Sequence, residues 1–298
     1  MASGLLFAGI ELGGTKSIAV LARENEVVDQ ITVPTQGPGE TLGRLSNVLR
    51  KWSEDHPLAA LGIASFGPIR LDRTAPEYGR MHETPKPGWS GAPVTEALSA
   101  GLDCPWTIDT DVNGAALAEY RWGAGRGAIS LCYVTIGTGV GGGLVIDGRT
   151  VHGAMHPEIG HLSLRRLADD RFEGACRFHG DCIEGLISGP ALAARFGGDP
   201  SRVTDDDFRW EAVASDIAEL AGAILLTISA QRILIGGGVG LARASVLDRA
   251  RALLVERQAN YLPFLRAENA QDILRAPELG DRAGPLGAIA LAMHAAEG

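Results

Sequence analysis

Residues 130–151, SLCYVTIGTGVGGGLVIDGRTV, repeat the pattern of residues 7–28, FAGIELGGTKSIAVLARENEVV. Each stretch combines an apolar strand, a glycine turn and a second apolar strand. Glycine turns between apolar strands are also common in unrelated hairpins, so a coincidental likeness stays open. A true duplication predicts two similar lobes, one for each copy.

Apolar spacing predicts an alternation of strands and helices around these two copies. The expected strands span residues 5–10, 17–21, 27–33, 58–66, 106–108 and 233–235, with a further one near Ile273; the expected helices span 40–55, the run after Asn113, much of 188–231, 245–258 and 286–294. We expect an α/β chain with a small lobe at 1–112 and a larger lobe at 113–284. The final helix, 285–298, is expected to pack back on the first lobe.

Composition limits the classes of function. The 298 residues are 45% hydrophobic and 21% charged, which is typical of a soluble globular protein. A formal net charge of -9 argues against a general nucleic-acid or anionic-membrane surface. No run approaches the roughly 18 apolar residues of a membrane span, and the N-terminal stretch resembles a first strand more than a signal peptide. We therefore expect a cytoplasmic protein that binds neither nucleic acid nor membrane.

Residues 67–93 are too rich in glycine and proline for a regular element. Long loops of this kind are usually either functional or disordered. The embedded Tyr78 and Trp89 favour an ordered loop beside a cleft, although single aromatic residues in loops often serve packing alone.

Three glycine turns follow apolar strands, and each can direct backbone amides at an anion. None matches the Walker A or dinucleotide pattern, and each alone is commonly structural. Together they favour a nucleotide-binding cleft between two lobes. The turns comprise Gly13, Gly14, Thr15 and Lys16; Gly137, Thr138 and Gly139; and Gly236, Gly237, Gly238 and Val239.

Asp111 lies between a predicted strand and a predicted helix. A carboxylate at a strand end suits a general base that accepts the proton of an attacking hydroxyl during phosphoryl transfer. An aspartate before an Ala-rich run also suits a helix N-cap, and spacing alone leaves both roles open.

The loop at residues 156–184 carries a candidate zinc site. Cys176, His179 and Cys182 form CxxHxxC, and His161 precedes them in HPEIGH. Two thiolates and two imidazoles complete a tetrahedral structural zinc site, while His156 is a competing ligand. Unliganded cysteines with surface histidines are the alternative. Glu158 and Glu184 bracket this loop and have the chemistry to accept hydrogen bonds from sugar hydroxyls.

The segments LGGTK, DTDVNGAAL, TIGTGVGGG, HPEIGH, CxxHxxCxEG and IGGGV occur in the order found in the ROK family, and the chain resembles that family over nearly its whole length. TPKPGW and the histidine of CRFHGDC resemble its bacterial fructokinase branch. The resemblance implies an actin/hexokinase-like (ribonuclease H-like) α/β fold, with two lobes around a nucleotide and sugar cleft.

The resemblance also implies the site and the reaction. Asp111 would be the general base, Glu158, His161 and Glu184 would hold the sugar, and His161 would also bind zinc. ATP would contact Thr15, Lys16, Thr138, Pro190 and the 236–239 turn, with Mg²⁺ on its phosphates. The implied reaction moves the ATP γ-phosphate to the C6 hydroxyl of fructose, and homodimers are common in the family.

Two positions depart from the family pattern. Glu11 stands where most members have Asp, and Thr110 stands where many have Asn. The extra methylene of Glu11 could alter how metal-bound phosphate is held, and Thr110 could remove one sugar contact.

Other functions remain as alternatives. Discrimination between hexoses depends on a few hydrogen bonds, so a kinase for glucose, mannose or N-acetylmannosamine stays open. ROK repressors share the lobes and the zinc motif, but they carry a DNA-binding segment that we do not expect in this acidic chain. An actin-like filament protein is a third reading, which Glu158 and Glu184 argue against.

Overall fold

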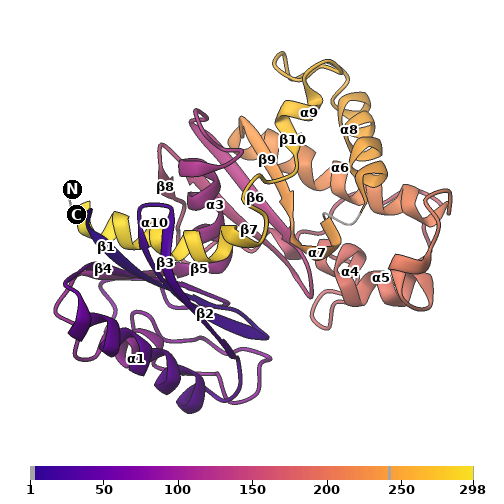
Figure 1. Cartoon of the computed structure of the whole chain (residues 1–298). Helices are drawn as coiled ribbons and strands as arrows, with labels where there is room; N and C mark the ends of the chain where they lie inside the picture. The colour runs from indigo at the N-terminus through magenta and orange to yellow at the C-terminus, as the bar shows by residue number, and fades with distance from the viewer. Residues whose placement is uncertain (1–3, 241–242, 298) are drawn as a thin grey trace. The chain divides into compact units, whose positions relative to one another are not determined.

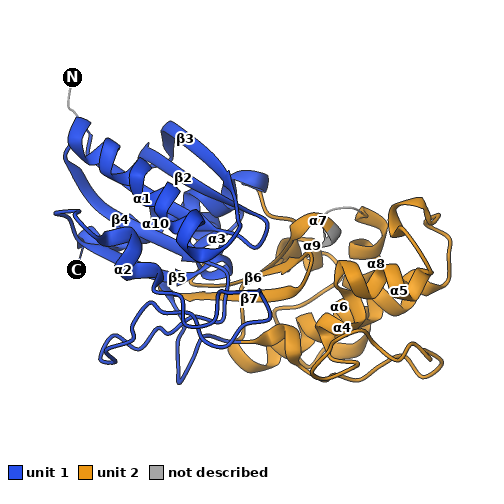
Figure 2. Cartoon of the chain, turned by 90° about the horizontal axis from the view of Figure 1, so that it is seen from below, with its two compact units in different colours: residues 1–126, 148–157, 279–298 blue, residues 127–147, 158–278 orange. Residues whose placement is uncertain are grey.

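The computed structural model of the chain describes residues 4–240 and 243–297 (Figure 1). Two compact units divide the chain (Figure 2). Unit 1 comprises Met1–Arg126, Gly148–Pro157 and Leu279–Gly298, and unit 2 comprises Gly127–Asp147 and Glu158–Glu278.

Unit 1 contains a mixed sheet with the strand order β3-β2-β1-β4-β5. β1 pairs antiparallel with β2, β2 antiparallel with β3, and β4 lies parallel to both β1 and β5. The bounds confirm the strands expected from the sequence: β1 Leu6–Leu12, β2 Lys16–Arg23, β3 Glu26–Pro34, β4 Leu58–Ser65 and β5 Trp106–Thr110.

Unit 2 repeats the central part of this arrangement. β6 (Ser130–Ile136) pairs antiparallel with β7 (Val140–Ile146) and parallel with β9 (Arg232–Gly236), which in turn pairs parallel with β10 (Leu274–Arg275). The β6–β7 hairpin beside parallel β9 corresponds to the β1–β2 hairpin beside parallel β4. The expected duplication is therefore present in the strand pairing. The short β8 (Arg149–Thr150) follows in unit 1.

Helix α1 (Pro38–Asp55) forms where the sequence predicts a helix, and its apolar face is buried in unit 1. Proline occupies its first turn, where the missing N–H costs no helical hydrogen bond. Leu42, Leu45, Leu49 and Trp52 recur on one face and are all buried, as their spacing predicts. The other helices of unit 1 are α2 Val94–Ser99, α3 Asp111–Trp122 and α10 Ala283–Glu297.

Unit 2 holds most of the helices, and α6 packs against α8. The segment expected to be mainly helical at 188–231 divides into α5, a short 3-10 turn and α6. The bounds are α4 Ile183–Ile187, α5 Gly189–Phe196, α6 Arg209–Ile228, α7 Gly237–Gly240, α8 Ala244–Gln258 and α9 Ala270–Ile273; the 3-10 turns are η1 Ile159–His161, η2 Pro200–Arg202 and η3 Gly280–Arg282.

The units divide the chain differently from the boundary that we expected at residue 112. Helix α3 belongs to unit 1 because it packs on α10, where a Cβ at Gly287 would overlap the backbone of Gly114. Glu119 of α3 is fully buried, and its carboxylate accepts backbone hydrogen bonds from Ala124 at 2.7 Å and Leu279 at 2.8 Å. These two hydrogen bonds connect the end of α3 to the start of the C-terminal segment.

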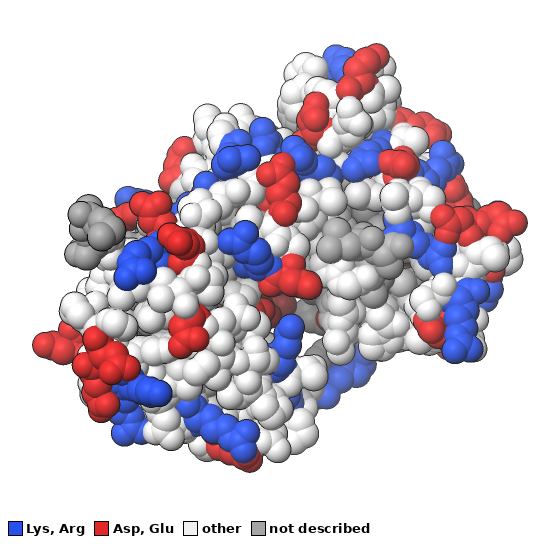
Figure 3. Space-filling view, viewed as in Figure 1, with Lys and Arg blue, Asp and Glu red and all other residues white. Residues whose placement is uncertain are grey.

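The surface agrees with the acidic composition. On the face shown in Figure 3, the described lysines and arginines are interspersed with acidic residues. No helix among the described residues combines the length and the apolar character needed to cross a membrane.

Candidate active site

The turn between β1 and β2 is held by a residue that follows β3. Thr35 donates its hydroxyl to the carbonyl of Gly13 at 2.7 Å and its N–H to the carbonyl of Thr15 at 2.9 Å. A Cβ at Gly13 would lie 2.6 Å from the carbonyl oxygen of Lys16, so this position requires glycine. Gly14, Thr15 and Lys16 are exposed. The predicted phosphate turn is thus a fixed loop whose outer residues are accessible to a ligand.

Asp111 is the first residue of α3, and the helix begins earlier than the Ala-rich run predicts. The hydroxyl of Thr110 accepts the N–H of Asn113 at 3.2 Å, so Thr110 is the N-cap. The alternative that Asp111 caps the helix is therefore wrong. One Asp111 oxygen accepts the N–H of Val112 at 2.8 Å. Burial raises the pKa of Asp111 to about 6, partly offset by backbone hydrogen bonds.

Glu11 lies near the end of β1 and senses the charge of Asp111. Burial, and then the negative charge of Asp111, raises the pKa of Glu11 to about 7, while Lys16 acts in the opposite direction. A Cβ at Gly284, at the start of α10, would overlap the Glu11 carboxylate. The missing side chain at Gly284 therefore provides the space that the longer glutamate occupies.

Asp109 accepts hydrogen bonds from several neighbouring groups, and the sequence analysis did not identify it as a site residue. Its side chain is 3% exposed and accepts the N–H of Thr110 and the amide of Asn113, both at 2.7 Å. It also accepts the hydroxyl of Thr150 at 2.8 Å and lies 2.9 Å from Nε2 of His152, whose pKa it raises. The spacing of Asp109 and Asn113 in DTDVN, four residues apart across the helix start, was the available signal. This network fixes the segment that presents Asp111.

The glycine turn of unit 2 is bonded to the start of α5. Gly137 donates its N–H to the carbonyl of Gly139 at 2.9 Å, and its own carbonyl accepts the N–H of Gly189 at 2.7 Å. Pro190 stands in the first turn of α5, and Ser188 caps that helix. Thr138 lies at the tip of the turn, so the structure brings the predicted residues Thr138 and Pro190 to neighbouring segments.

Glu184 of α4 reaches the same turn. Its Oε2 accepts the N–H of Val140 at 3.1 Å, and a Cβ at Gly139 would lie 2.7 Å from that oxygen. The carboxylate expected to hold a sugar is thus placed directly beside the turn expected to hold phosphate.

The third glycine run ends β9 and begins a helix instead of forming an open turn. Gly236 is the last residue of β9, and α7 starts at Gly237, whose φ is +82°. A Cβ at Gly237 would meet the backbone of Ile136 at the end of β6. Gly238 and Val239 continue α7; the side chain of Val239 lies outside the described part of the structure.

An apolar cavity adjoins this point in unit 2. Its volume is about 170 Å³. Gly238 contributes to its wall, together with Ile136, Ile187, Trp210, Val213 and Ile235. The cavity therefore opens between the ends of β6 and β9 and the helices α4 and α6.

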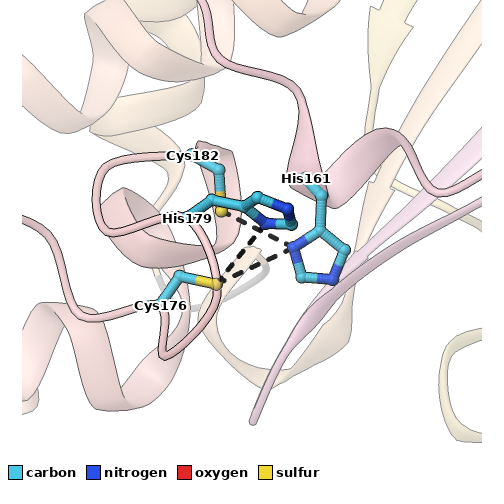
Figure 4. A group of neighbouring side chains, drawn as sticks. All are labelled: His161, Cys176, His179 and Cys182. Atoms are coloured by element: carbon cyan, nitrogen blue, oxygen red, sulfur yellow. Dashed lines mark hydrogen bonds between the residues drawn. The ribbon is translucent and has the colours of Figure 1, made fainter.

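The four predicted metal ligands converge. His161, Cys176, His179 and Cys182 offer ligand atoms that all lie within 4.8 Å of one another (Figure 4). Nδ1 of His161 lies 3.8 Å from Sγ of Cys176 and 3.6 Å from Sγ of Cys182. Tetrahedral zinc with ordinary Zn–S and Zn–N bonds places sulfur and nitrogen about 3.6 Å apart. The donor set and spacing therefore fit one tetrahedral ion.

Backbone contacts shape the loop that brings these ligands together. Cys176 and Gly180 exchange backbone hydrogen bonds, and Ile183 donates to the carbonyl of Leu162 at 3.0 Å. A Cβ at Gly185 would overlap the carbonyl of Gly180, so the loop packs only around glycine. These backbone contacts connect parts of the segment that carries the four candidate ligands.

His156 is not part of this cluster. Its Nε2 lies 3.4 Å from the backbone nitrogen of Ile69 in unit 1, and the side chain is buried. Its role as a competing metal ligand is therefore wrong. Glu158 immediately precedes η1, and its carbonyl accepts the N–H of His161 at 3.0 Å.

Residues 67–93 form an ordered loop with short bridges between Ile69 and Met81 and between Arg80 and Pro93. Trp89 is fully buried, and its indole N–H donates to the carbonyl of Gln36 at 2.9 Å. Tyr78 stacks on Trp106 with ring centroids 5.8 Å apart. Packing therefore describes Trp89, whereas Tyr78 is half-buried and lines a cavity of unit 1 together with Trp106.

Comparison with known proteins agrees with this geometry. The ROK family model matches residues 7–295. The chain is 40% identical to the fructokinase of Zymomonas mobilis, covering 97% of both chains. It is 37% identical to a putative fructokinase of Bacillus subtilis, covering 97% of this chain and 96% of the relative.

A solved structure is similar over the whole length. The ROK hexokinase from Thermus thermophilus has 27% identity and a TM-score of 0.79, covering 99% of this chain and 100% of that one. The resemblance drawn from the sequence motifs is therefore confirmed. The chain belongs to the ROK family and has its two-lobed, actin/hexokinase-like α/β fold.

Proposed function

We propose that this protein is an ATP-dependent sugar kinase that phosphorylates fructose at its C6 hydroxyl. One observation carries the chemistry: Thr110 and not Asp111 caps α3, and both the Asp111 carboxylate and Lys16 of the Gly13–Lys16 turn shift the pKa of Glu11. A base beside a phosphate turn suits transfer of a phosphoryl group to a hydroxyl. The choice of fructose rests on the fructokinase relatives at 37–40% identity.

In this proposal Asp111 accepts the proton of the attacking hydroxyl. Its pKa of about 6 leaves it ionised near neutral pH while keeping it a stronger base than an exposed aspartate. Glu158, His161 and Glu184 hold the sugar hydroxyls. Thr15 and Lys16 in unit 1, and Thr138, Pro190 and the 236–239 segment in unit 2, hold ATP. The apolar cavity beside Gly238 suits the adenine ring.

The proposal assigns Mg²⁺ and Zn²⁺ to two different sites. Mg²⁺ would neutralise charge on the phosphates, and an oxygen of Glu11 is a ligand of the kind that it prefers. Zinc fits His161, Cys176, His179 and Cys182 and stabilises the loop that leads into Glu184. The homodimer expected from the resemblance stays a prediction.

The test is ADP release from MgATP with fructose, glucose, mannose and N-acetylmannosamine in parallel. We expect the highest kcat/KM with fructose. Another preferred sugar would retain the kinase and replace its substrate, while no release with any sugar would contradict the proposal. Asp111→Asn, tested on the preferred sugar, is the matched control for contaminating kinases.

A further inference from the structure

Lysine is rare in this chain, and two of its three lysines meet at one turn. The chain has 27 lysines and arginines, of which only Lys16, Lys51 and Lys86 are lysines. Lys16 ends the β1–β2 turn, and the ammonium of Lys86 donates a hydrogen bond to the carbonyl of Gly14 at 2.5 Å. Lysine supplies a compact charge, which suits a phosphate oxygen better than it suits bidentate pairing with a carboxylate.

The segment that carries Lys86 is held from both sides. Trp89 is buried, contacts Phe66 with ring centroids 5.0 Å apart, and is bonded to Gln36. Its N–H donates to the carbonyl of Lys86 at 3.2 Å, which closes a turn. Pro85 and Pro87 flank the lysine and restrict its backbone. The backbone at Lys86 is therefore held in one conformation, while the Lys86 side chain can change its rotamer to reach a ligand.

The charge of Lys86 is not used in an ion pair. Among the described residues, its ammonium contacts the Gly14 carbonyl and lies 5.8 Å from the centroid of the Phe66 ring, and no carboxylate pairs with it. Many arginines of the same chain form ion pairs, for example Arg195 with Asp170 and Asp216. A carbonyl carries no net charge, so the hydrogen bond to Gly14 does not neutralise the ammonium. The positive charge of Lys86 can therefore attract an anionic ligand.

From this geometry, and resting on the kinase function proposed above, we propose that Lys86 is a catalytic residue that binds the phosphoryl group being transferred. Its ammonium leaves the Gly14 carbonyl for an oxygen of the terminal phosphate of ATP. The sugar oxygen forms a bond to the γ-phosphorus as the bond to the β–γ bridging oxygen breaks. The hydroxyl proton passes to Asp111, and Lys86 keeps its protons and stabilises the charge on the moving phosphoryl group.

Lysine footprinting tests this contact without relying on turnover. Each lysine is a separate reporter, so acetylation of Lys16, Lys51 and Lys86 is followed by mass spectrometry with MgATP, MgADP, AMP or fructose as the probe. We expect MgATP to slow acetylation of Lys86 at least severalfold, MgADP to slow it less, and AMP and fructose to leave it unchanged. Lys51, which is exposed on α1, is the internal control.

Kinetics of matched variants completes the test. Lys86→Met should lower kcat about 10²-fold with a smaller change in the KM for fructose, as expected for a lost electrostatic contact to transition-state charge. Lys86→Arg should recover part of the loss, and Lys51→Met should match the parent protein. Equal melting temperatures would exclude misfolding as the cause.

Three results would overturn the role of Lys86: no protection by MgATP, protection by fructose alone, or kcat within twofold of the parent in Lys86→Met. A protein that binds MgATP and protects Lys86 but phosphorylates no sugar would instead contradict the proposed substrate class. The footprint thereby separates failure of the contact from failure of the proposed function.

Discussion

The carboxylate of Glu11 occupies the space that a side chain at Gly284 would take. The two residues come from opposite ends of the chain, on β1 and at the start of α10. The glycine at this position of α10 therefore supplies the room that the Glu11 side chain occupies.

Gly284→Ala should disturb Glu11 without unfolding the protein. The added Cβ meets the flexible end of a side chain, and alanine favours the helix by up to about 1 kcal/mol, so the melting temperature should hold or rise. The displaced carboxylate should raise the KM for MgATP roughly tenfold, about 1.4 kcal/mol of binding. The double variant Glu11→Asp, Gly284→Ala restores the space and should recover most of this loss. A fully active Gly284→Ala would refute the relationship.

Asp111→Asn should lower turnover by about 10²–10⁴, as expected for loss of a general base. In the parent protein, kcat/KM should fall as the pH drops below about 6, because protonation of Asp111 removes the base. Retained turnover in Asp111→Asn would show that another group accepts the proton.

The same variant should be more stable at neutral pH. Folding raises the pKa of Asp111 to about 6, so the native state holds this proton more tightly than the unfolded chain. Its contribution to stability is present below the ordinary aspartate pKa and is lost as pH rises towards 6. After allowance for the remaining solvent exposure, Asn should gain about 1–2 kcal/mol at pH 7.5. Melting curves at pH 5 and pH 7.5 check this, and an equal gain at both would argue against titration of Asp111.

Removing the zinc site should loosen the loop that carries Glu184. Elemental analysis should find about one zinc per chain in the parent protein and little in Cys182→Ser, with a stability loss on the order of several kcal/mol. Fructose affinity should fall with it. Cys104→Ser, which changes a cysteine outside the cluster, should keep both zinc and stability. Unchanged zinc content in Cys182→Ser would exclude this ligand set.

A buried ion network in unit 2 should be costly to break. Arg195 is 4% exposed and contacts Asp170 at 3.1 Å and Asp216 at 3.2 Å. Burial outweighs the attraction of Arg195 and raises the pKa of Asp216 to about 7. Removing the arginine takes away the ion-pair partner of buried Asp216, while Asp170 keeps Arg166 at 2.9 Å, so Arg195→Met should destabilise the protein by about 3–5 kcal/mol.

Arg202→Met is the matched control, because its ion pair with Asp199 is exposed and should contribute less than about 1 kcal/mol. Chemical denaturation of both variants at pH 8 measures the difference. Equal stability of the two would show that the buried network contributes little. The Arg195→Met loss should also shrink towards pH 6, where Asp216 is protonated.

Local sequence determined the elements and the turns. Continuous apolar runs located β1 and β2, and helical spacing located α1, within a few residues, because both patterns reflect which side chains are buried. Glycine runs located the turns at 13–16 and 137–139, since glycine permits close backbone approach, whereas the run at 236–239 ends β9 and begins α7. The CxxHxxC spacing placed three metal ligands on one loop, and the histidine of the preceding HPEIGH segment supplied the fourth, His161. These signals lie within short segments or in residue type.

Tertiary structure alone decided how distant residues meet. Thr110 rather than Asp111 caps α3 because the helix start is fixed by the Asp109 network, which joins β5 to Thr150 and His152. The space at Gly284 for Glu11, and the contact of Lys86 with Gly14, depend on how α10 and the 67–93 loop pack against β1. No local periodicity records such contacts, because they arise only when separate elements are packed into one core.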